Sequence, residues 1–442
     1  MNIDNIISII EKKISSLDSD DYSLLLSKDH EDLIRFSNNS VNVFDIIENI
    51  SIEIYIGKDK KRASGVLYNL DERSILAYID SLFQYCIDSP INNDYTSLPS
   101  GPFDYGKIPS MNVSQSINYE SIIDHVENSI NHGLQSGASR VCGSFTSTTS
   151  EIFLKTSTGI ESVDKSITNL LNVRAFTESK SSGHGLSCAS SINDIDSSNA
   201  GFDAGEYAKS SMNPKRCEPG KYDILFTPTV AADIFQFVGH AASADSVDSG
   251  DSFLANKMNL QVSSDALSIS DHGNPQNGIY NRRFDDEGVP TQSTNIIENG
   301  ILKNYLHNVS TARKYGVDST GNAGIMSPWC WNLEVSSGSS TFEEQLSSIE
   351  NGLLITNNWY TRFQNPAAGS YSTVPRDACF VISNGKITTP IQGIRISDEI
   401  PRQLSNIDSL SKTRKWISWW EVETPVLAPS IVVKDVPVTR ST

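Results

Sequence analysis

The stretch Ser51-Ile-Glu-Ile-Tyr-Ile56 alternates apolar and polar side chains, and Ser40-Val-Asn-Val-Phe44 shortly before it follows the same pattern. A period of two places the apolar residues on one face of an extended strand. Residues 57–61 are the expected turn after the second stretch, and residues 62–68 are the expected returning strand. The pattern therefore predicts antiparallel strands with one buried face.

Helical periodicity surrounds these strands. Apolar residues at spacings of three and four predict a first helix, and a wide apolar stripe after Asp71, a suitable N-cap, predicts another. A further helix is expected to start near Asp20 and to include Leu24 to Leu26. The apolar positions of the first helix are Ile3, Ile6, Ile7, Ile10, Ile14 and Leu17. Together these patterns predict strands that pack against helices.

A chain of 442 residues is too long for one ordinary core, so two or three domains are expected. Residues 1–88 and 118–213 are interpreted as N-terminal α/β regions, and residues 89–117, rich in Pro, Asn, Ser and Gly, as a linker between them. Residues 214–442 are interpreted as a C-terminal β-rich domain with a capping box at 341–344. The predicted fold class is α+β.

Composition limits the function classes. The net charge is −18 and the pI about 4.8, which argues against DNA or RNA as the main partner, because nucleic-acid binding needs a basic face. The six cysteines include no Cys-x-x-Cys pair, which favours reduced thiols in a cytosolic protein. Neither a signal peptide nor an apolar run long enough to span a bilayer is visible. We therefore expect a cytoplasmic protein that binds neither nucleic acid nor membrane.

A C-terminal helix expected from 229 to 242 contains the segment Asp233-Ile-Phe-Gln-Phe-Val-Gly-His240. A zinc peptidase helix has two histidines on one face and a glutamate beside the first. Phe235 and Gln236 stand where the first histidine and the glutamate would be, and His240 stands at the second histidine. A phenyl ring cannot ligate zinc, and an amide cannot take a proton from water. If the helix descends from a metallopeptidase helix, it has lost its metal and its base.

Several polar and glycine-rich motifs follow one another in a fixed order between residues 214 and 395. They are Pro219-Gly-Lys-Tyr-Asp223, Arg282-Arg-Phe-Asp-Asp-Glu-Gly-Val-Pro-Thr-Gln-Ser-Thr294, Ser319-Thr-Gly-Asn-Ala-Gly324, Ala368-Gly-Ser-Tyr-Ser372 and Ile382-Ser-Asn-Gly-Lys-Ile-Thr-Thr-Pro390. This ordered set resembles the TldD/PmbA family, sometimes labelled modulators of DNA gyrase, and the resemblance spans nearly the whole chain. It implies a three-part α+β protein.

The resemblance also implies a branch of that family. Members of the TldD branch have His-Glu-x-x-x-His and a late cysteine that completes a zinc site. Members of the PmbA branch, also called TldE, lack these residues and pair with a TldD subunit. The chain resembles the PmbA branch, because Phe235 and Gln236 replace two of the helix residues and the region Ser418 to Glu421 has no cysteine. This implies no catalytic residue, metal or cofactor in the chain itself, and zinc only in a TldD-type partner.

The function implied by the resemblance is that of a non-catalytic subunit. It would join a TldD-type zinc metallopeptidase, or a second copy of itself, and act on unfolded or extended peptides. The candidate substrate or partner contacts are Arg282, Arg283, Asp285, Asp286, Trp419 and Trp420. The acidic run also fits a turn between strands, and the tryptophans also fit a buried core cluster.

Two alternatives stay open at this point. The first is an autonomous metallopeptidase with unorthodox ligands, such as His240 with Asp or Cys residues that folding brings near it. The second is a protein-binding regulator of DNA gyrase, which the older family label suggests.

Overall fold

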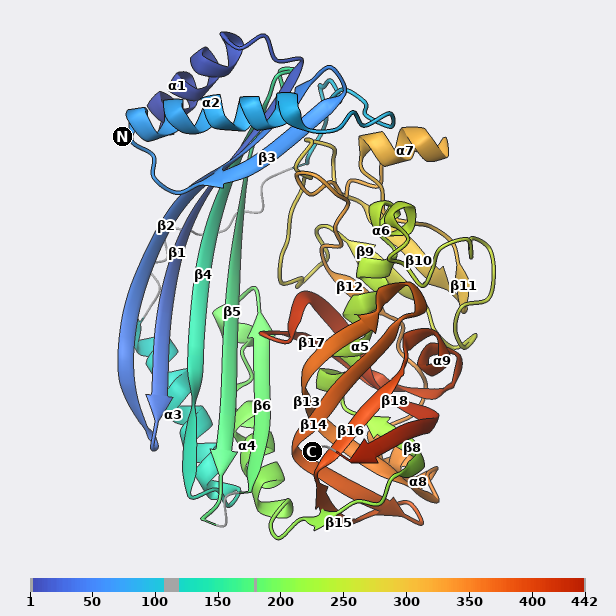
Figure 1. Ribbon diagram of the computed structural model, residues 1–442. Coiled ribbons are helices and arrows are strands. Elements are labelled where there is room, and N and C mark those ends of the chain that lie inside the picture. Colours follow the sequence, from blue (N-terminus) through green and yellow to red (C-terminus); the bar gives the residue numbers. More distant parts are fainter. Residues whose placement is uncertain (1–2, 107–118, 179–180, 441–442) are drawn as a thin grey trace.

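The structure, a computed structural model, describes residues 3–106, 119–178 and 181–440. One six-stranded antiparallel sheet, in the order β3-β2-β1-β4-β5-β6, stands beside a β-rich C-terminal domain (Figure 1). Because β1 pairs with β4, the two N-terminal regions suggested by the sequence share a single sheet. Its strands are β1 (Asp21–Ser37), β2 (Ser40–Lys58), β3 (Lys61–Leu67), β4 (Arg140–Thr156), β5 (Glu161–Phe176) and β6 (Ser182–Ala189).

The helices of the N-terminal half pack on one face of this sheet, in two pairs at its opposite ends (Figure 1). β1 presents Leu24 and Leu26 to the first pair and Ile34 to the second. The first pair is α1 (Ile3–Ser15) and α2 (Glu72–Asp88), and the second pair is α3 (Tyr119–Gln135) and α4 (Ser197–Ser210), with the short 3₁₀ helix η1 (Ile192–Asp194) before α4.

The helix expected from Asp20 is wrong, because β1 occupies this segment. Leu24 and Leu26 belong to the core under α1 and α2, whereas Leu25 lies in a separate cluster with Phe284 of the C-terminal domain. A strand that is buried on both faces has a continuous apolar run instead of an alternating pattern. Such a run cannot be distinguished from a helical segment by periodicity alone.

β2 is one 19-residue strand that includes both of the stretches expected as separate strands. β1 pairs along nearly its whole length, but β3 pairs only with residues 52–58. Within the described residues, 40–50 are therefore a free edge of the sheet, and all of them are exposed. The large apolar side chains on this edge are Val41, Val43, Phe44, Ile46, Ile47 and Ile50.

The C-terminal domain is built on a twelve-stranded mixed sheet. Its main path is β11-β10-β9-β12-β18-β8-β13-β14-β15-β7, and both β16 and β17 pair with β18. The strands are β7 (Lys215–Arg216), β8 (Gly220–Phe226), β9 (Ile269–His272), β10 (Ser293–Glu298), β11 (Ile301–Leu302), β12 (Leu333–Val335), β13 (Asn351–Asn365), β14 (Ser370–Ser383), β15 (Lys386–Gln392), β16 (Ile394–Glu399), β17 (Ile407–Trp419) and β18 (Val422–Arg440). The predicted α+β fold class is confirmed.

Both helices expected in the C-terminal domain are present. α5 (Pro228–Ala241) packs mainly against β18 and β13. α8 (Phe342–Ser347) begins with the expected capping box of Thr341 and Glu344. The remaining helices are α6 (Ala244–Ser249), α7 (Val309–Tyr315), α9 (Ile400–Ser405) and the short η2 (Pro366–Ala368).

Of the expected linker, residues 89–106 contain neither helix nor strand, and residues 107–117 lie outside the described part of the chain. Of the helices that the structure describes, none combines the length and the apolar character needed to cross a membrane.

Candidate functional site

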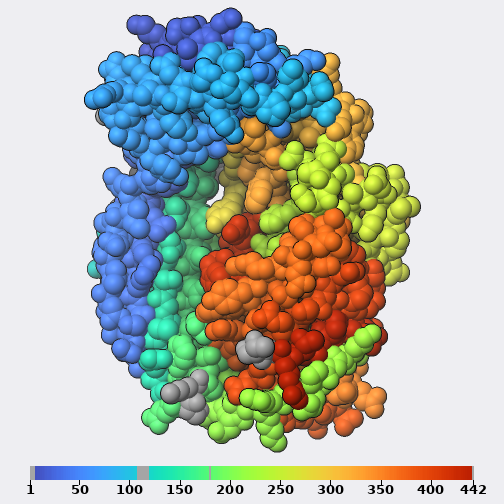
Figure 2. Space-filling view, in the orientation of Figure 1, coloured from blue at the N-terminus to red at the C-terminus, as the bar shows by residue number. Residues whose placement is uncertain are grey.

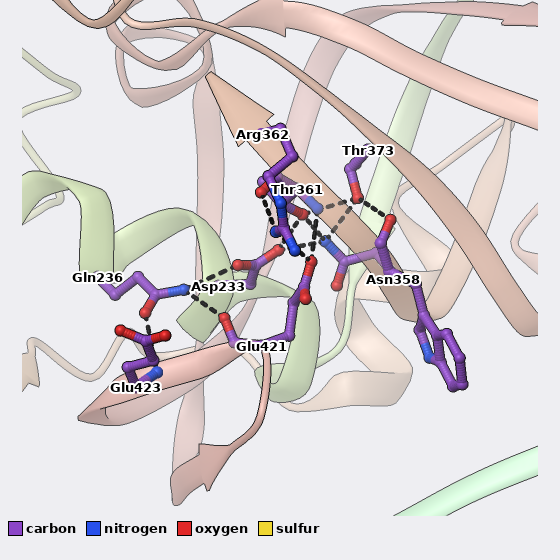
Figure 3. A network of polar contacts seen from close by, with 9 residues as sticks. Asp233, Gln236, Asn358, Thr361, Arg362, Thr373, Glu421 and Glu423 are labelled. Atoms are coloured by element: carbon purple, nitrogen blue, oxygen red, sulfur yellow. Dashed lines mark hydrogen bonds and ion pairs between the residues drawn. The ribbon is translucent and has the colours of Figure 1, made fainter.

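α5 is buried on nearly every side, as an almost wholly apolar helix should be. Phe235 is fully buried in the main core of the C-terminal domain. Asp233 and Gln236 are the polar exceptions on this helix, and both are buried as well (Figure 3). Their polar atoms therefore need partners inside the protein.

Three hydrogen bonds fix the side chain of Gln236 (Figure 3). Its Nε2 donates to Oδ1 of Asp233 at 2.8 Å and to the main-chain carbonyl of Glu421 at 2.7 Å. Its Oε1 accepts a hydrogen bond from the main-chain N–H of Glu423 at 3.1 Å. Gln236 thus joins α5 to the turn between β17 and β18, with both N–H groups of its amide engaged.

Asp233 is the centre of the polar network in Figure 3. Its carboxylate accepts hydrogen bonds from the side chains of Gln236, Asn358 and Thr361. Burial raises the pKa of Asp233 to about 7, although these hydrogen bonds favour the ionised form and lower the pKa. The contacts hold the segment 358–361 of β13, where the pairing with β14 is irregular.

Glu421 lies in the β17–β18 turn, the region where the resemblance placed a late cysteine. Its buried side chain accepts hydrogen bonds from the main-chain N–H of Thr361 at 2.5 Å and from Nη1 of Arg362 at 3.2 Å. Burial raises the pKa of this carboxyl group. Asp233 and Glu421 therefore hold the same segment of β13 from two elements that are distant in the sequence.

His240 lies at the C-terminal end of α5 and is half-buried. Its Nε2 is 3.3 Å from Oγ1 of Thr424, and its ring lies 4.8 Å from the ring of Trp329. Burial lowers the pKa of His240 to about 4, so the imidazole is neutral at pH 7. These contacts describe an imidazole that packs among aromatic and hydroxyl neighbours.

The segment that contains the acidic run joins the two halves of the molecule. Arg283 is 7% exposed and donates to Asp164 of β5 at 3.0 Å. Asp285 is fully buried and accepts hydrogen bonds from three main-chain N–H groups. Arg282 and Asp286 form a salt bridge of 2.8 Å. Arg283 and Asp285 are thus engaged with other parts of the chain, and Arg282 and Asp286 are paired with each other.

The two candidate tryptophans have different surroundings. Trp419 is buried, and its ring lies 4.7 Å from that of His184 in β6. Trp420 is 48% exposed and packs edge-on against Trp359 at 5.2 Å. Trp420 is therefore the one of the two that offers a surface to another molecule.

The sequence patterns did not indicate Asp233 or the pair Trp359 and Tyr360. A lone carboxylate within an apolar helix is the signal that could have indicated Asp233, because buried acids need specific partners. Two adjacent aromatic residues in a strand are the signal for the pair, since alternation buries only one of two neighbours.

Comparison with known proteins places this site in a family. Residues 219–440 match the family model of the PmbA/TldA metallopeptidase C-terminal domain. This chain belongs to the PmbA/TldD family. The family resemblance deduced from the ordered motifs is thereby confirmed.

Among curated members of the PmbA/TldD family, the Metalloprotease PmbA homolog of Buchnera aphidicola (subsp. Acyrthosiphon pisum) is 32% identical over 205 residues, which are 46% of this chain and 44% of the relative. Metalloprotease PmbA of Escherichia coli O157:H7 is 30% identical over 207 residues, which are 47% of this chain and 44% of the relative. The matched part thus spans less than half the length of these relatives.

Solved structures extend the likeness in fold to the whole chain. TldE from Thermococcus kodakarensis is 17% identical and matches 99% of both chains with a TM-score of 0.84. A candidate modulator of a DNA gyrase from Thermotoga maritima MSB8 is 23% identical and matches 99% of this chain and 100% of that chain with a TM-score of 0.83. At these identities the likeness shows a common fold.

The family description names a metallopeptidase, and the motif resemblance implies zinc as the metal. The donor atoms at the three helix positions do not fit a zinc site. Phe235 has no donor atom, and the amide of Gln236 is engaged within the protein. His240 alone could contribute an imidazole, whereas catalytic zinc takes about three protein ligands. In the described ranges, no three His, Cys, Asp or Glu side chains converge as metal ligands would.

Proposed function

We propose that this chain is a non-catalytic subunit that works with a catalytic TldD-type zinc metallopeptidase on unfolded or extended peptides. The observation that supports this most is the state of Gln236, which replaces the catalytic glutamate of the family motif. Its amide is buried and holds Asp233 and the β17–β18 turn. In this proposal, the side chain at position 236 stabilises the fold and takes no part in catalysis.

A cavity between the two halves of the molecule supports a role in binding extended peptides. It has a volume of about 450 Å³ and lies between the β6–α4 region and the C-terminal domain. Asp203 and Lys415 line it with opposite charges, 3.6 Å apart, beside the hydroxyl groups of Thr229 and Thr413. Such a mixture suits a peptide main chain, which has both donors and acceptors. Figure 2 shows an opening between the N-terminal sheet and the C-terminal domain of this chain.

The free edge of β2 supports a protein partner. Edge strands with unpaired main-chain groups and apolar side chains readily add another strand. Residues 40–50 have both properties within the described chain. The partner would be a TldD-type subunit or a second copy of this chain.

Digestion of an unfolded protein such as casein tests the proposal. We expect the TldD-type subunit to cleave casein faster, or at more sites, when this chain is added at equal concentration. The isolated chain should show no chelator-sensitive cleavage. Equal digestion with and without this chain would remove the proposal, and chelator-sensitive cleavage by this chain alone would favour an autonomous metallopeptidase.

A further inference from the structure

Three aromatic side chains meet beside the network of Asp233 and Glu421, and we call Trp359, Tyr360 and Trp420 the aromatic platform. The ring centroids of Trp359 and Trp420 are 5.2 Å apart, and those of Tyr360 and Trp420 are 5.9 Å apart. All of these contacts are edge-on, an arrangement that leaves ring faces available to another planar group.

The aromatic platform is exposed to solvent, although large aromatic residues are usually buried. Tyr360 is 50% exposed and Trp420 is 48% exposed. Exposed aromatic groups that lie together mark binding surfaces more often than isolated ones do. The platform therefore has apolar area that the folded chain itself does not cover.

The main chain of Tyr360 is held in an unfavourable conformation. Its φ of 58° lies in the left-handed region, which costs a bulky side chain about 1–3 kcal/mol. The next residue, Thr361, is fixed on both sides, because its N–H donates to Glu421 and its hydroxyl donates to Asp233. The network around α5 thus keeps Tyr360 in the orientation that exposes its ring.

Arg376 adds a positive charge to the aromatic platform. Its guanidinium lies 5.1 Å from the ring of Trp359 and 5.9 Å from the ring of Tyr360. It is exposed and has no carboxylate partner among the described residues. Arg174, on the same Trp359 ring, differs in this respect because it is paired with Asp377.

Arg376 also lines a cavity of about 510 Å³ beside the aromatic platform. The acidic residue that lines this cavity, Asp377, is engaged by Arg174, Ser182 and Asn357. A carboxylate from outside would therefore meet an unpaired guanidinium here. Arginine binds carboxylates through two parallel hydrogen bonds, and this geometry also suits a guanidinium that is stacked on a ring.

We propose that the aromatic platform and Arg376 bind a peptide segment in which an aromatic side chain lies next to a carboxylate. The ring of the peptide stacks on Tyr360 and Trp420, and its carboxylate pairs with Arg376. This inference deepens the proposed function, on which it rests, by naming the chemistry of the substrate. The carboxylate can be an acidic side chain or the C-terminus of the peptide.

Calorimetric titration of the full chain with short unlabelled peptides tests the inference. The first probe is the acetylated and amidated peptide Gly-Ser-Phe-Glu-Ser-Gly, with Phe-Gln and Ala-Glu analogues as comparisons. The second is acetylated Gly-Ser-Gly-Ser-Phe with a free or an amidated C-terminus. If an acidic side chain supplies the carboxylate, we expect the Phe-Glu peptide to bind more tightly than either analogue. If the C-terminus supplies it, we expect the peptide with a free C-terminus to bind more tightly than its amidated form.

Variants assign the binding to the platform. We expect Arg376→Gln to weaken binding of the preferred peptide by roughly tenfold and Trp420→Ala by roughly fivefold. Arg376→Lys keeps the charge but loses the paired hydrogen bonds, so an intermediate loss is expected. The matched controls Arg73→Gln and Tyr85→Ala change exposed residues of α2 and should leave binding unchanged.

Three results would overturn the inference. They are equal affinity for the acidic and neutral forms in both arms, no effect of Arg376→Gln and Trp420→Ala, and no binding to the unmodified chain below about 1 mM. Digestion with the TldD-type subunit is measured separately. If this chain accelerates digestion and Arg376→Gln does so equally well, the platform inference fails while the proposed function stands.

Discussion

Nε2 of Gln236 lies 2.7 Å from the main-chain carbonyl oxygen of Glu421, 185 residues further along the chain. The same nitrogen donates to the carboxylate of Asp233. A glutamate at position 236 would place an acceptor against both of these acceptors. The structure therefore favours an amide over a carboxylate at this position.

Gln236→Glu should destabilise the protein by about 2–4 kcal/mol, because it removes two donated hydrogen bonds and adds a buried charge beside Asp233. Urea unfolding at pH 7 measures the loss. The matched control is Gln364→Glu, which introduces the same charge at an exposed position of β13. Equal unfolding midpoints for the two variants would contradict the structural role of Gln236.

The stability of the protein should depend on the protonation of Asp233, whose pKa burial raises from 3.8 to about 7. A carboxyl with a raised folded-state pKa binds its proton more tightly when folded. Its contribution is therefore complete below pH 3.8 and declines as the pH rises to about 7.

We expect the free energy of unfolding of the unmodified protein, relative to that of Asp233→Asn, to decrease between about pH 4 and pH 7 and then to level off. The comparison removes the titration of carboxyl groups that both proteins share, Glu421 among them. Urea unfolding at a series of pH values measures it, and a constant difference over this range would contradict the prediction.

The purified chain, without an affinity tag, should contain far less than one zinc per molecule. The reason is chemical: Phe235 offers no donor atom, and the amide of Gln236 is engaged. Elemental analysis after dialysis against metal-free buffer measures the content. A value near one zinc per chain would mean that His240 has ligands other than those of the family motif.

Ile46→Lys should weaken association with a TldD-type subunit, or with a second copy, by roughly tenfold, because it places a charge on the apolar edge of β2. Ile46 is 49% exposed, so folding should be unaffected. Sedimentation velocity measures the association. Ile387→Lys, at an exposed position of β15, is the control, and unchanged association of Ile46→Lys would exclude this edge as the interface.

Asp285→Ala should cost roughly 3 kcal/mol or more, because three main-chain N–H groups lose their acceptor. Thermal unfolding measures the loss, and Asp265→Ala, at an exposed position, serves as the control. If Asp285→Ala instead abolished peptide processing without a change in unfolding, Asp285 would contact the substrate.

Periodicity predicted much of the fold, and it failed where burial was unusual. Alternation indicated β2, and helical spacing indicated α1 and α2. β1 was misread because Leu25 is buried on the face opposite to Leu24 and Leu26, which removes the alternation. The platform was only partly predicted. Trp420 was a candidate, whereas the positions of Tyr360 and Arg376 depend on irregular pairing between β13 and β14, which no local sequence pattern predicts.

The sequence by itself determined that positions 235 and 236 have neither the imidazole nor the carboxylate of a zinc peptidase helix, because Phe235 and Gln236 stand there. It also determined the α+β class, since the two periodicities are local properties. Only the tertiary structure decided what these positions do instead. The bonds from Gln236 to Asp233 and to the β17–β18 turn, and the exposure of Tyr360 and Trp420, join residues far apart in the chain. Such contacts depend on how buried polar groups find partners once the whole chain has packed.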